Sequence, residues 1–531
     1  MTMMCISITA SAYDFEVDNM FYTVLSVPEL TVSVAASPDK YQGTITIPQS
    51  VEWSGRCFSV ISIDRNAFYE CGELKEIYIP TSIKTVGSNA FFKTYLEKVH
   101  LEDIESWFNV TLDYTSITSG HPVDSNPFKN GASLYIGDEL IENLILPEGI
   151  TLNDNFSGCG SIRKVTLPES YSYLGSSFAH CKNLETIDLK GTNITIGSYA
   201  FYGCDKLNFN FLNKCCTLSP YAFKDCNMSR LSIPNSITEV GYGLCQYCPN
   251  LEYCSIGNGI SELPYESGAL PYREPEGMNM FDGCNRLKII DIDDSKNPLD
   301  VKYCGYDKYI DIDKTRYWGS FAELKLESIS IYRQLSYRDS DKYRSSVYAP
   351  FAGCKSLKKA YIGGSTTILN NDFFRECSSL EFVTLGKNIE NIDGSVFMNC
   401  NNLKQIRLES SIPPSFSNAA FSHSQLLSII IIVPDGCVDV YMQSIGWKDF
   451  LNIVEESNVE VGIAPIISDK WPVSVSHDGI IYEGENGASI VICGIDGKCH
   501  YSGNFSSGQF IALSKGIYIL TLNGKSIKVK I

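Results

Sequence analysis

The sequence predicts a solenoid, a strand-rich superhelix of the α/β type in which stacked coils form a parallel sheet, followed by a C-terminal antiparallel β-sandwich. Three observations lead to this prediction. Phe-x-x-Cys recurs along most of the 531 residues, a Leu-x-x-Ile-x-Ile pattern follows it, and short alternating segments separated by turn residues end the chain. Because a chain of this length exceeds what one hydrophobic core usually supports, repeats or several domains are expected.

The Phe-x-x-Cys motif sets the period of the coils. The uninterrupted intervals are 22 or 23 residues, within the range of leucine-rich repeats. Phe91 continues the series with Thr94 in the cysteine position, and Leu244 continues it with Cys248 one place late. The nine complete motifs are Phe68/Cys71, Phe156/Cys159, Phe178/Cys181, Phe201/Cys204, Phe223/Cys226, Phe281/Cys284, Phe351/Cys354, Phe374/Cys377 and Phe397/Cys400.

Each coil contains one strand. In "LKEIYIP" (74–80) and "LEFVTL" (380–385) the last apolar residues alternate, so they lie on the same face of a strand. One coil of this length cannot bury its own apolar side. Stacking the coils buries it and places the strands in a parallel sheet.

The unit "CGELKEIYIPTSIKTVGSNAF" (71–91) resembles the BspA-like leucine-rich repeats of bacterial surface proteins, and the resemblance covers most of the chain. The opening segment "YDFEVDNMFYTVLS" is similar to the β-rich N-terminal cap of such proteins. The segment "IIIIVPDGCVDVYMQSIGWKDFLNIVEE" resembles their closing unit, in which we expect Tyr441, Trp447 and Phe450 to cover the last coil.

Both ends of the chain indicate export. Ala10-Ser11-Ala12 is typical of the end of a signal peptide, so we expect a signal peptide whose front is missing from this sequence and which is cleaved after Ala12. The C-terminal "SKGIYILTLNGKSIKVKI", with turns at Asp496-Gly497 and Asn523-Gly524, resembles the sorting domain of the type IX secretion system. The expected organisation is a signal-peptide remnant (1–12), an N-terminal cap (13–66), a solenoid (67–456) with insertions near 104–135, 262–280 and 297–350, a linker (457–472) and a sorting-like domain (473–531).

Composition and charge exclude several classes of partner. The 61 acidic and 43 basic residues give a formal net charge of −18, which disfavours nucleic acids and anionic membrane surfaces because both require a basic patch. No apolar run reaches the roughly 18 residues of a transmembrane span. We expect an extracellular or cell-surface bacterial protein that is monomeric.

The sequence predicts no catalytic centre, metal site or cofactor. The six histidines form neither a metalloprotease motif nor part of a nucleophile signature. The periodic cysteines are interpreted as small buried apolar residues rather than a redox or metal array. A zinc site at Cys245-Gln246-Tyr247-Cys248 is the less favoured alternative. Disulfides among the clustered cysteines stay open: Cys215, Cys216, Cys226, Cys245 and Cys254.

The surface is therefore the candidate functional region. Side chains between the apolar strand positions are expected to form an extended outward face, with packing across the sheet as the alternative reading. The aromatic-rich insertion at 297–350 is a second candidate, because insertions in solenoids often carry binding. The candidate binding residues are Tyr78, His100, Tyr253, Tyr361, Phe382 and Arg407 on the strands, and Tyr317, Trp318 and Tyr343 in the insertion.

The resemblance implies adhesion. We expect the protein to bind a protein or glycan ligand at a cell surface or in the host matrix, without catalysis. One alternative is a glycan-processing or other hydrolytic enzyme with its site in the 297–350 insertion. The other is a passive structural spacer.

Overall fold

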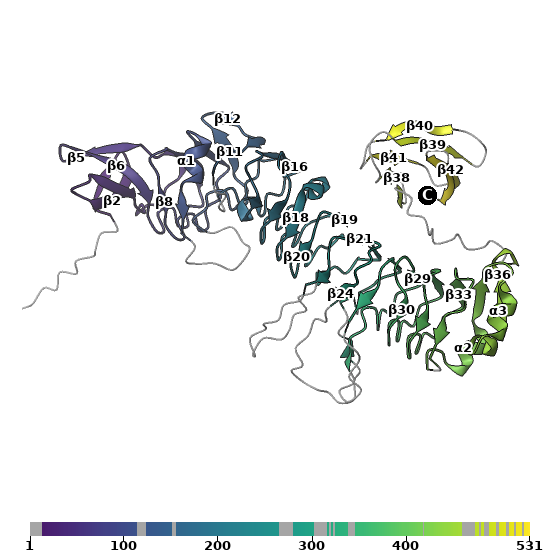
Figure 1. The fold of residues 1–531 in the computed structure, drawn as a ribbon. Helices are drawn as coiled ribbons and strands as arrows, with labels where there is room; N and C mark the ends of the chain where they lie inside the picture. Colours follow the sequence, from purple (N-terminus) through teal and green to yellow (C-terminus); the bar gives the residue numbers. More distant parts are fainter. Residues whose placement is uncertain are drawn as a thin grey trace, which may run out of the picture. The chain divides into compact units, whose positions relative to one another are not determined.

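The chain forms two compact units, Met1–Val459 and Glu460–Ile531, in a computed structural model (Figure 1). Each unit is described by itself. The residues that the structure describes are 13–113, 124–150, 155–264, 280–301, 316–317, 320–321, 324–337, 346–417, 419–458, 473–476, 479–482, 488–494, 499–505, 509–513, 517–522 and 525–530. The predicted signal-peptide remnant, 1–12, lies outside them.

The first unit begins with a mixed sheet. Strands β1, β2 and β3 pair antiparallel, β5 pairs antiparallel with β6, and β3, β6, β8 and β10 continue as parallel neighbours. The apolar residues Tyr22, Val32 and Val60, each at most 1% exposed, face the core and start the stack. The strands are β1 (Phe15–Val17), β2 (Met20–Ser26), β3 (Thr31–Val34), β5 (Ser50–Trp53), β6 (Arg56–Ile63), β8 (Thr85–Val86) and β10 (Thr111–Leu112).

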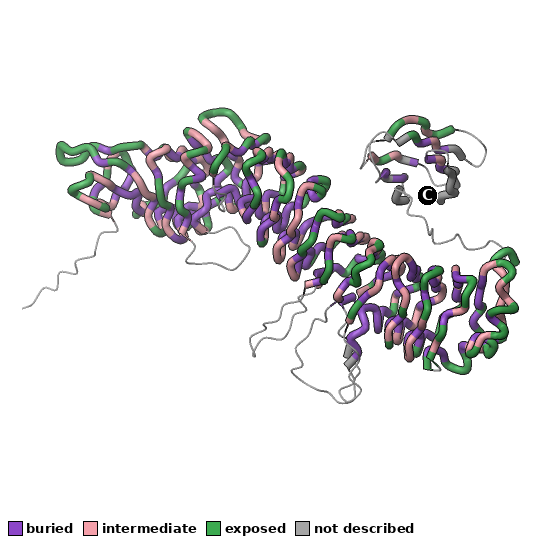
Figure 2. The backbone as a smooth tube through the Cα atoms, in the orientation of Figure 1, coloured by how far each residue is buried: buried purple, intermediate pink, exposed green. Residues whose placement is uncertain are grey.

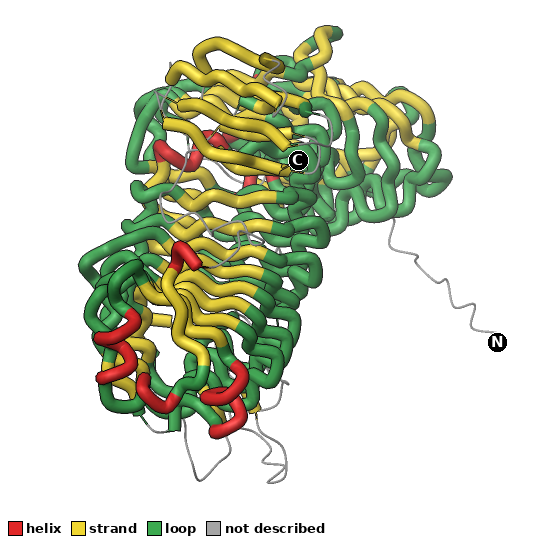
Figure 3. Tube along the Cα trace, turned by 90° about the vertical axis from the view of Figure 1, so that its right-hand side faces the viewer, coloured by secondary structure: helices red, strands yellow, loops and turns green. Residues whose placement is uncertain are grey.

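The Leu-x-x-Ile-x-Ile strands form parallel sheets along one side of the coils, as predicted (Figure 3). β11 and β12 add a hairpin between two of these sheets. The strands are β4 (Gly43–Thr46), β7 (Leu74–Ile79), β9 (Lys98–Leu101), β11 (Ser133–Ile136) and β12 (Glu139–Leu140); then β13 (Asn143–Ile145), β14 (Lys164–Leu167) and β16 (Thr186–Leu189); then β19 (Arg230–Ile233), β21 (Tyr253–Ile256), β23 (Ile289–Ile292), β26 (Ser328–Ile331), β29 (Lys359–Ile362), β31 (Phe382–Leu385), β33 (Gln405–Leu408), β35 (Ile430–Val433) and β36 (Asn452–Glu455).

Shorter strands come from the second apolar pair of each coil. They again pair in parallel, in small separate sheets. They are β15 (Tyr173–Leu174), β17 (Ile194–Ile196), β18 (Cys215–Leu218) and β20 (Glu239–Val240); β22 (Glu262–Leu263), β24 (Leu299–Val301) and β27 (Leu335–Ser336); β30 (Ile368–Leu369), β32 (Asn391–Ile392) and β34 (Ser415–Phe416); and β25 (Arg316–Tyr317) with β28 (Ser346–Val347).

One coil departs from the predicted strand pattern. After Leu207 the chain forms the 3-10 helix η2 (Asn210–Lys214) at the position where neighbouring coils have a long strand. Phe211 and Leu212 still point inward, with 6% and 1% exposure. The segment buries them through a helical turn although Leu207, Phe209 and Phe211 alternate in the sequence as they would in a strand.

The core runs through the coils as a column of phenylalanines. Successive rings stack, for example Phe68 on Phe91 with centroids 5.2 Å apart and Phe374 on Phe397 at 5.8 Å. The buried positions recur in every coil (Figure 2). Each coil therefore buries its apolar side against its neighbours, as the period predicts.

The last coil is covered by a small helical cap. Tyr441, Trp447 and Phe450 are buried, as expected from the sequence. The Trp447 Nε1–H donates to the Pro414 carbonyl (2.6 Å), and the Tyr441 hydroxyl donates to the Ser410 carbonyl (2.7 Å). The helical segments of this unit are α1 (Ile104–Phe108), α2 (His423–Ser428), α3 (Val438–Gln443), η1 (Ser176–Phe178), η2, η3 (Trp447–Asp449) and η4 (Glu456–Asn458).

The second unit contains two antiparallel sheets. Both contribute to one cluster of buried side chains that includes Ile480, Tyr482, Ile490 and Leu520. The expected turns at 496–497 and 523–524 lie outside the described residues. The strands are β37 (Val473–Ser476), β38 (Gly479–Tyr482) and β41 (Phe510–Ala512) in one sheet, and β40 (Cys499–Phe505), β39 (Ala488–Gly494), β42 (Ile517–Leu522) and β43 (Lys525–Lys530) in the other.

Candidate functional site

Equivalent side chains of neighbouring coils form rows across the outward face of the parallel sheets. Tyr78, His100 and Tyr135 share one register position in β7, β9 and β11. Tyr361 and Arg407 share another in β29 and β33, two strands apart. Because coils repeat at about one strand spacing, roughly 4.8 Å, side chains of one row are close enough to touch.

The first row is a stack of three rings. The His100 ring lies 4.0 Å from the Tyr78 ring at 16° and 4.7 Å from the Tyr135 ring at 21°. His100 is only 4% exposed. The expectation of an exposed side chain is therefore wrong for His100, because its neighbours in the row cover both faces of the imidazole.

Both ring nitrogens of His100 face oxygen atoms. Nδ1 lies 2.6 Å from the Gly137 carbonyl, and Nε2 lies 2.7 Å from Oε1 of Glu76. The imidazolium form, with two N–H groups, donates to both oxygens at once. Burial acts to raise the pKa of Glu76, but hydrogen bonds from His100, Lys98 and Thr44 outweigh it and lower that pKa.

Tyr361 is also buried, with 4% exposure, so the expectation of an exposed ring is wrong here too. Its hydroxyl lies over Gly363, where an added Cβ would come within 2.5 Å of the oxygen. The hydroxyl donates to Oε2 of Glu409 at 3.3 Å, two coils further along the stack. Its ring contacts Tyr332, with centroids 5.1 Å apart.

These contacts shift the acid–base properties of the cluster. Burial raises the pKa of Glu409 above its usual value. Burial and then the charges of Asp291 and Asp293 raise the pKa of Tyr332 to about 12. Burial and then Glu409 raise the pKa of Tyr361 well above its ordinary value. The tyrosines therefore stay neutral hydrogen-bond donors beside several carboxylates.

The remaining predicted strand residues are partly exposed. Tyr253 donates its hydroxyl to Asp291 Oδ2 (2.8 Å), and the Arg230 guanidinium lies 3.8 Å from the Tyr253 ring centroid. Arg407 pairs with Glu456. Phe382 and Tyr78 are half-buried.

The aromatic insertion is described only in part. Tyr317 belongs to β25, which pairs with β28, and its side chain lies outside the described residues. Trp318 and Tyr343 also lie outside them. The segment 297–350 is not a pure insertion, because it also supplies the core strands β24 and β26.

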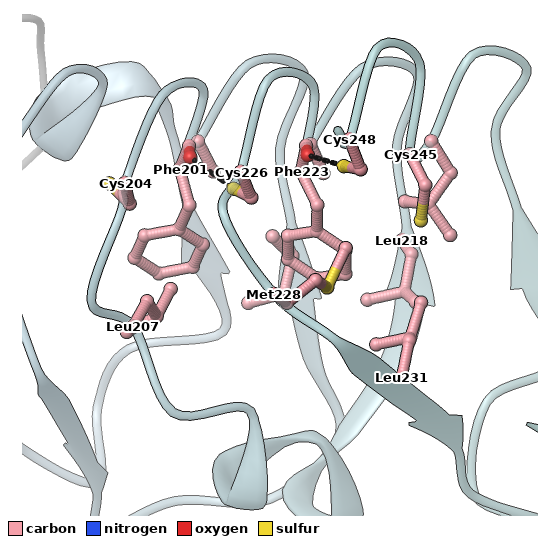
Figure 4. Packing of buried hydrophobic residues seen from close by; sticks show 14 of the residues in the cluster. Phe201, Cys204, Leu207, Leu218, Phe223, Cys226, Met228, Leu231, Cys245 and Cys248 are labelled. Carbon is pink, nitrogen blue, oxygen red and sulfur yellow. Dashed lines mark hydrogen bonds between the residues drawn. The ribbon is translucent and has the colours of Figure 1, made fainter. Parts of the chain in front are cut away.

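The ladder cysteines have a structural role that goes beyond filling space. Cys226 Sγ donates to the Phe201 carbonyl, and Cys248 Sγ donates to the Phe223 carbonyl, both at 3.1 Å (Figure 4). The same bond to the preceding coil's phenylalanine carbonyl recurs at Cys181, Cys204, Cys354, Cys377 and Cys400. Thr94, in the cysteine position of its coil, donates Oγ1 to the Phe68 carbonyl at 3.1 Å.

A tight turn places each of these sulfurs. The residue before every ladder cysteine has a positive φ, including Glu70 at 58°, Glu376 at 60° and Asn399 at 61°. Burial raises the pKa of Cys226 and Cys400 to about 12. These thiols are therefore inert at neutral pH.

The cysteine cluster around Cys245 and Cys248 contains free thiols. Each of Cys215, Cys216, Cys226, Cys245 and Cys254 is unpaired in the structure. Within the described residues, no group of three or more His, Cys, Asp or Glu side chains is arranged to hold a metal ion.

Sequence reasoning missed a second aromatic cluster. A group of tyrosines lies at the corners that lead into the cysteine turns, and their rings contact one another or the Lys224 ammonium group: Tyr199, Tyr202, Tyr221, Tyr242 and Tyr247. The signal in the sequence is tyrosine two residues before Phe201, Phe223 and Leu244, where most other coils have Asn, Asp or Ser.

The repeats match a known family along more than half of the chain. The family is described as the BspA type leucine rich repeat region, and it matches in six copies over residues 56–121, 131–252 and 314–443. The chain belongs to this family. Leucine-rich repeat proteins generally act by binding or as structural elements rather than by catalysis.

Solved structures of similar proteins come from bacteria. A leucine-rich repeat protein from Bacteroides ovatus shares 21% identity, with 76% of this chain and 99% of that one covered and a TM-score of 0.40. A leucine rich cell surface protein from Faecalibacterium prausnitzii shares 17%, covering 77% and 96%, with a TM-score of 0.32. A leucine-rich repeat protein from Eubacterium ventriosum shares 16%, covering 79% and 92%, with a TM-score of 0.25.

No curated protein matches the chain. Of the helices in the described parts of the chain, none has both the length and the apolar character of a membrane span.

Proposed function

We propose that the protein is an exported, surface-associated BspA-type repeat protein that binds a macromolecular ligand, protein or glycan, through the outward face of β19–β36, without catalysis. The observation that carries this proposal is the fixed set of aromatic and charged groups on that face. Tyr253 is held by Asp291 and Tyr361 by Glu409. Groups held in place before binding lose little conformational entropy when a ligand arrives.

A protein ligand with basic side chains fits this face best. Arg230 stacks on Tyr253, whose hydroxyl donates to Asp291, so the chain's own guanidinium shows which chemistry the face accepts. Carboxylates at Asp293 and Glu409 lie in the same region, close enough to affect Tyr332. Aromatic residues and arginine pairs are the usual anchors of protein interfaces.

Two of the predicted residues act by positioning and not by contact. His100 and Tyr361 are buried, so they orient Tyr78 and Glu409. Tyr253, Phe382 and Arg407 are the strand residues of β19–β36 proposed to touch the ligand, and Tyr78 in β7 is proposed as a contact on the separate sheet that β7 belongs to. Tyr317, Trp318 and Tyr343 are proposed to add a second contact region.

The test is a binding screen of the full chain against matrix proteins by biolayer interferometry. Replacing Tyr253 and Phe382 together by serine is expected to weaken binding at least tenfold, because interface aromatics contribute about 1–2 kcal/mol or more each. Tyr95→Ser is the matched control, since Tyr95 is 57% exposed elsewhere on the unit. Unchanged affinity in the double variant would exclude the face.

The contribution of the 297–350 insertion to binding must be tested by point substitutions and not by deletion. Deleting 297–350 would remove Leu299, Val301, Ile329 and Ile331, all at most 1% exposed, and would break the stack. Serine at Tyr317, Trp318 and Tyr343 tests contact in this region without that damage. Hydrolysis of glycans by the wild-type chain, lost in this triple variant, would favour the enzyme alternative. The absence of any ligand would favour the spacer.

We also propose that 473–531 is a β-sandwich that acts as a sorting module. Its support is the antiparallel pairing of β37–β43 and the shared buried cluster. In a bacterium with type IX secretion, removal of 460–531 is expected to leave the protein in the cell. Normal export of the shortened chain would contradict this assignment.

A further inference from the structure

A tyrosine ridge, defined as Tyr199, Tyr202, Tyr221, Tyr242 and Tyr247 with Lys224, crosses three successive coils. Tyr199 stacks on Tyr221 with centroids 4.9 Å apart, and Tyr221 meets Tyr242 edge-on at 5.2 Å. Tyr199 also contacts Tyr202 at 5.9 Å. The ridge follows the stacking direction, at the corners of the coils, and it is separate from the sheet face.

One ammonium group joins the rings. Lys224 Nζ lies 5.5, 5.4 and 5.5 Å from the ring centroids of Tyr202, Tyr221 and Tyr247. These distances are within the range of cation–π attraction. The ridge is therefore one connected set of groups spanning the coils.

The backbone at two of these tyrosines is strained. Tyr199 and Tyr221 have φ of 58° and 59°, in the left-handed region that side chains other than Asn and Asp rarely adopt. In four other coils the equivalent position, two residues before the repeat phenylalanine, has a small polar residue in the same conformation: Asn66, Asn89, Asp372 and Ser395, with φ between 55° and 63°. The coil thus folds without tyrosine, and the strain points to a function.

The next coil leaves room for the rings. A Cβ at Gly243 would come within 2.3 Å of Tyr221 Cε1, and a Cβ at Gly283 would come within 2.1 Å of Tyr247 Cδ1. Both glycines have positive φ. Larger residues at these two positions would displace the tyrosines. The ridge therefore depends on Gly243 and Gly283 as well as on Tyr221 and Tyr247.

The surroundings of the ridge are polar. Among residues 176–264, all of which the structure describes, Tyr247 at 41% is the one exposed large hydrophobic side chain. Asp225 lies close enough to Tyr202 to help burial raise the pKa of that tyrosine to about 12. Rings, hydroxyls and single charges without exposed aliphatic groups suit a polyhydroxylated ligand better than an apolar protein surface.

We propose that the tyrosine ridge binds a neutral glycan chain that runs along the stacking direction. The coils advance by about 4.8 Å, comparable to the length of one pyranose unit, so successive sugars meet successive tyrosines. Tyr202 is only 5% exposed and supports the other rings from within. Pyranose C–H groups lie against the partly exposed rings of Tyr199, Tyr221 and Tyr242 and the exposed ring of Tyr247, and sugar hydroxyls bond to phenol oxygens and to Lys224. This site does not depend on the sheet face.

The test uses the full chain on an array of neutral oligosaccharides made of hexoses and pentoses, followed by calorimetry with any bound oligosaccharide. Tyr221→Asn and Tyr199→Asn introduce the residue found at Asn66 and Asn89 in two other coils and relieve the strain. We expect each to weaken binding at least tenfold while the melting temperature stays equal or rises. Tyr95→Asn, the matched control, is expected to bind like the wild type.

Several results would overturn the proposal. The wild type could bind no neutral oligosaccharide, or Tyr221→Asn could bind like the wild type. A lower melting temperature in Tyr221→Asn, together with lost binding, would show that the tyrosine serves the fold. A matrix protein that binds the wild type and not Tyr221→Asn, with no glycan bound, would assign the ridge to a protein partner. If the Tyr253 and Phe382 double variant loses its protein ligand but still binds the oligosaccharide, the ridge is a site separate from the sheet face.

Discussion

Cys377 allows a direct test of whether the ladder cysteine is a hydrogen-bond donor or only an apolar filler. It is fully buried, and its Sγ donates to the Phe351 carbonyl of the preceding coil at 3.2 Å. Threonine and valine have nearly the same shape, but only threonine has a donor. At Thr94 the threonine hydroxyl makes the equivalent bond at 3.1 Å. The pair Cys377→Thr and Cys377→Val therefore isolates the hydrogen bond.

The sign of the difference in stability between the threonine and the valine variant decides whether Cys377 acts as a hydrogen-bond donor or as an apolar filler. An apolar slot would favour valine, because burying an unpartnered hydroxyl costs about 1–3 kcal/mol in proteins. If the buried position provides a hydrogen-bond acceptor, the threonine variant is more stable by about 0.5–1.5 kcal/mol, the usual net contribution of one hydrogen bond to the free energy of unfolding. The Phe351 carbonyl also accepts the Cys354 N–H (3.1 Å), which keeps the expected value in the lower half of that range.

The assay is urea unfolding of the full chain at 25 °C, under reducing conditions, followed by circular dichroism. We expect Cys377→Thr to have a larger free energy of unfolding than Cys377→Val. Val383→Thr is the control: Val383 is 2% exposed and points into the core from β31, so threonine is expected to destabilise the protein there. A valine variant equal to or more stable than the threonine variant at position 377 would refute the donor role.

Four further predictions concern pH, packing and thiol reactivity. Because the pKa of Glu76 is lowered, its contribution to the free energy of unfolding is present above the ordinary value of 4.5 and is lost as the pH falls through the lowered pKa. The difference in free energy of unfolding between the wild type and Glu76→Gln should therefore shrink in acid. A difference that does not change with pH would contradict this. Glu409 has the opposite sign: its raised pKa means that stability is lost as the pH rises through that pKa, so Glu409→Gln should gain on the wild type over this window in the same urea titrations. Gly386→Ala would place a Cβ 2.6 Å from Gly363 Cα and should destabilise the protein by about 1–3 kcal/mol in thermal unfolding. In the control Gly394→Ala, the closest contact of the new Cβ is 3.3 Å to a side chain, so the stability should change by less than about 1 kcal/mol. Equal effects of the two substitutions would argue against the close approach at Gly386. In thiol labelling followed by mass spectrometry, the exposed Cys57 and Cys499 should react in the native state. Buried ladder thiols such as Cys204 and Cys377 should react only after unfolding, and no reductant should be needed. Rapid labelling of the ladder thiols in the native protein would contradict their burial.

The repeat could be predicted from the sequence because the residues that define the period are the ones that form the core. Phe351, Cys354, Leu357, Ala360 and Ile362 are all fully buried, as their spacing requires. The period did not foresee η2, because a coil that keeps its phenylalanine and cysteine can still replace its strand by a helical turn. The local apolar order does not reveal the difference either, because Leu207, Phe209 and Phe211 alternate as they would in a strand.

The candidate site was less predictable. The alternation correctly places Tyr361 on the outward side of β29, but it gives no information on how far a side chain bends along the stack. The hydroxyl reaches Glu409 because Gly363 has no side chain in the space that the hydroxyl occupies. His100 is likewise covered by two rings that are 22 and 35 residues away in the chain. Such contacts depend on several coils at once.

From Cys181 to Cys400 the sulfur-to-carbonyl bonds of the ladder point from one coil to the coil made before it, whereas Cys71 Sγ donates to the Tyr69 carbonyl of its own turn and Cys159 Sγ faces the Ser161 hydroxyl. During synthesis, each of the coils from Cys181 onward therefore brings a donor to a carbonyl that is already in place, and this part of the stack can close behind the ribosome one turn at a time. No cysteine follows Cys400 in the series, and Gln425 takes over by donating Nε2 to the Phe397 carbonyl at 3.1 Å. Duplicating or deleting a whole interior coil leaves donors and acceptors matched, which gives such genes a simple way to change length.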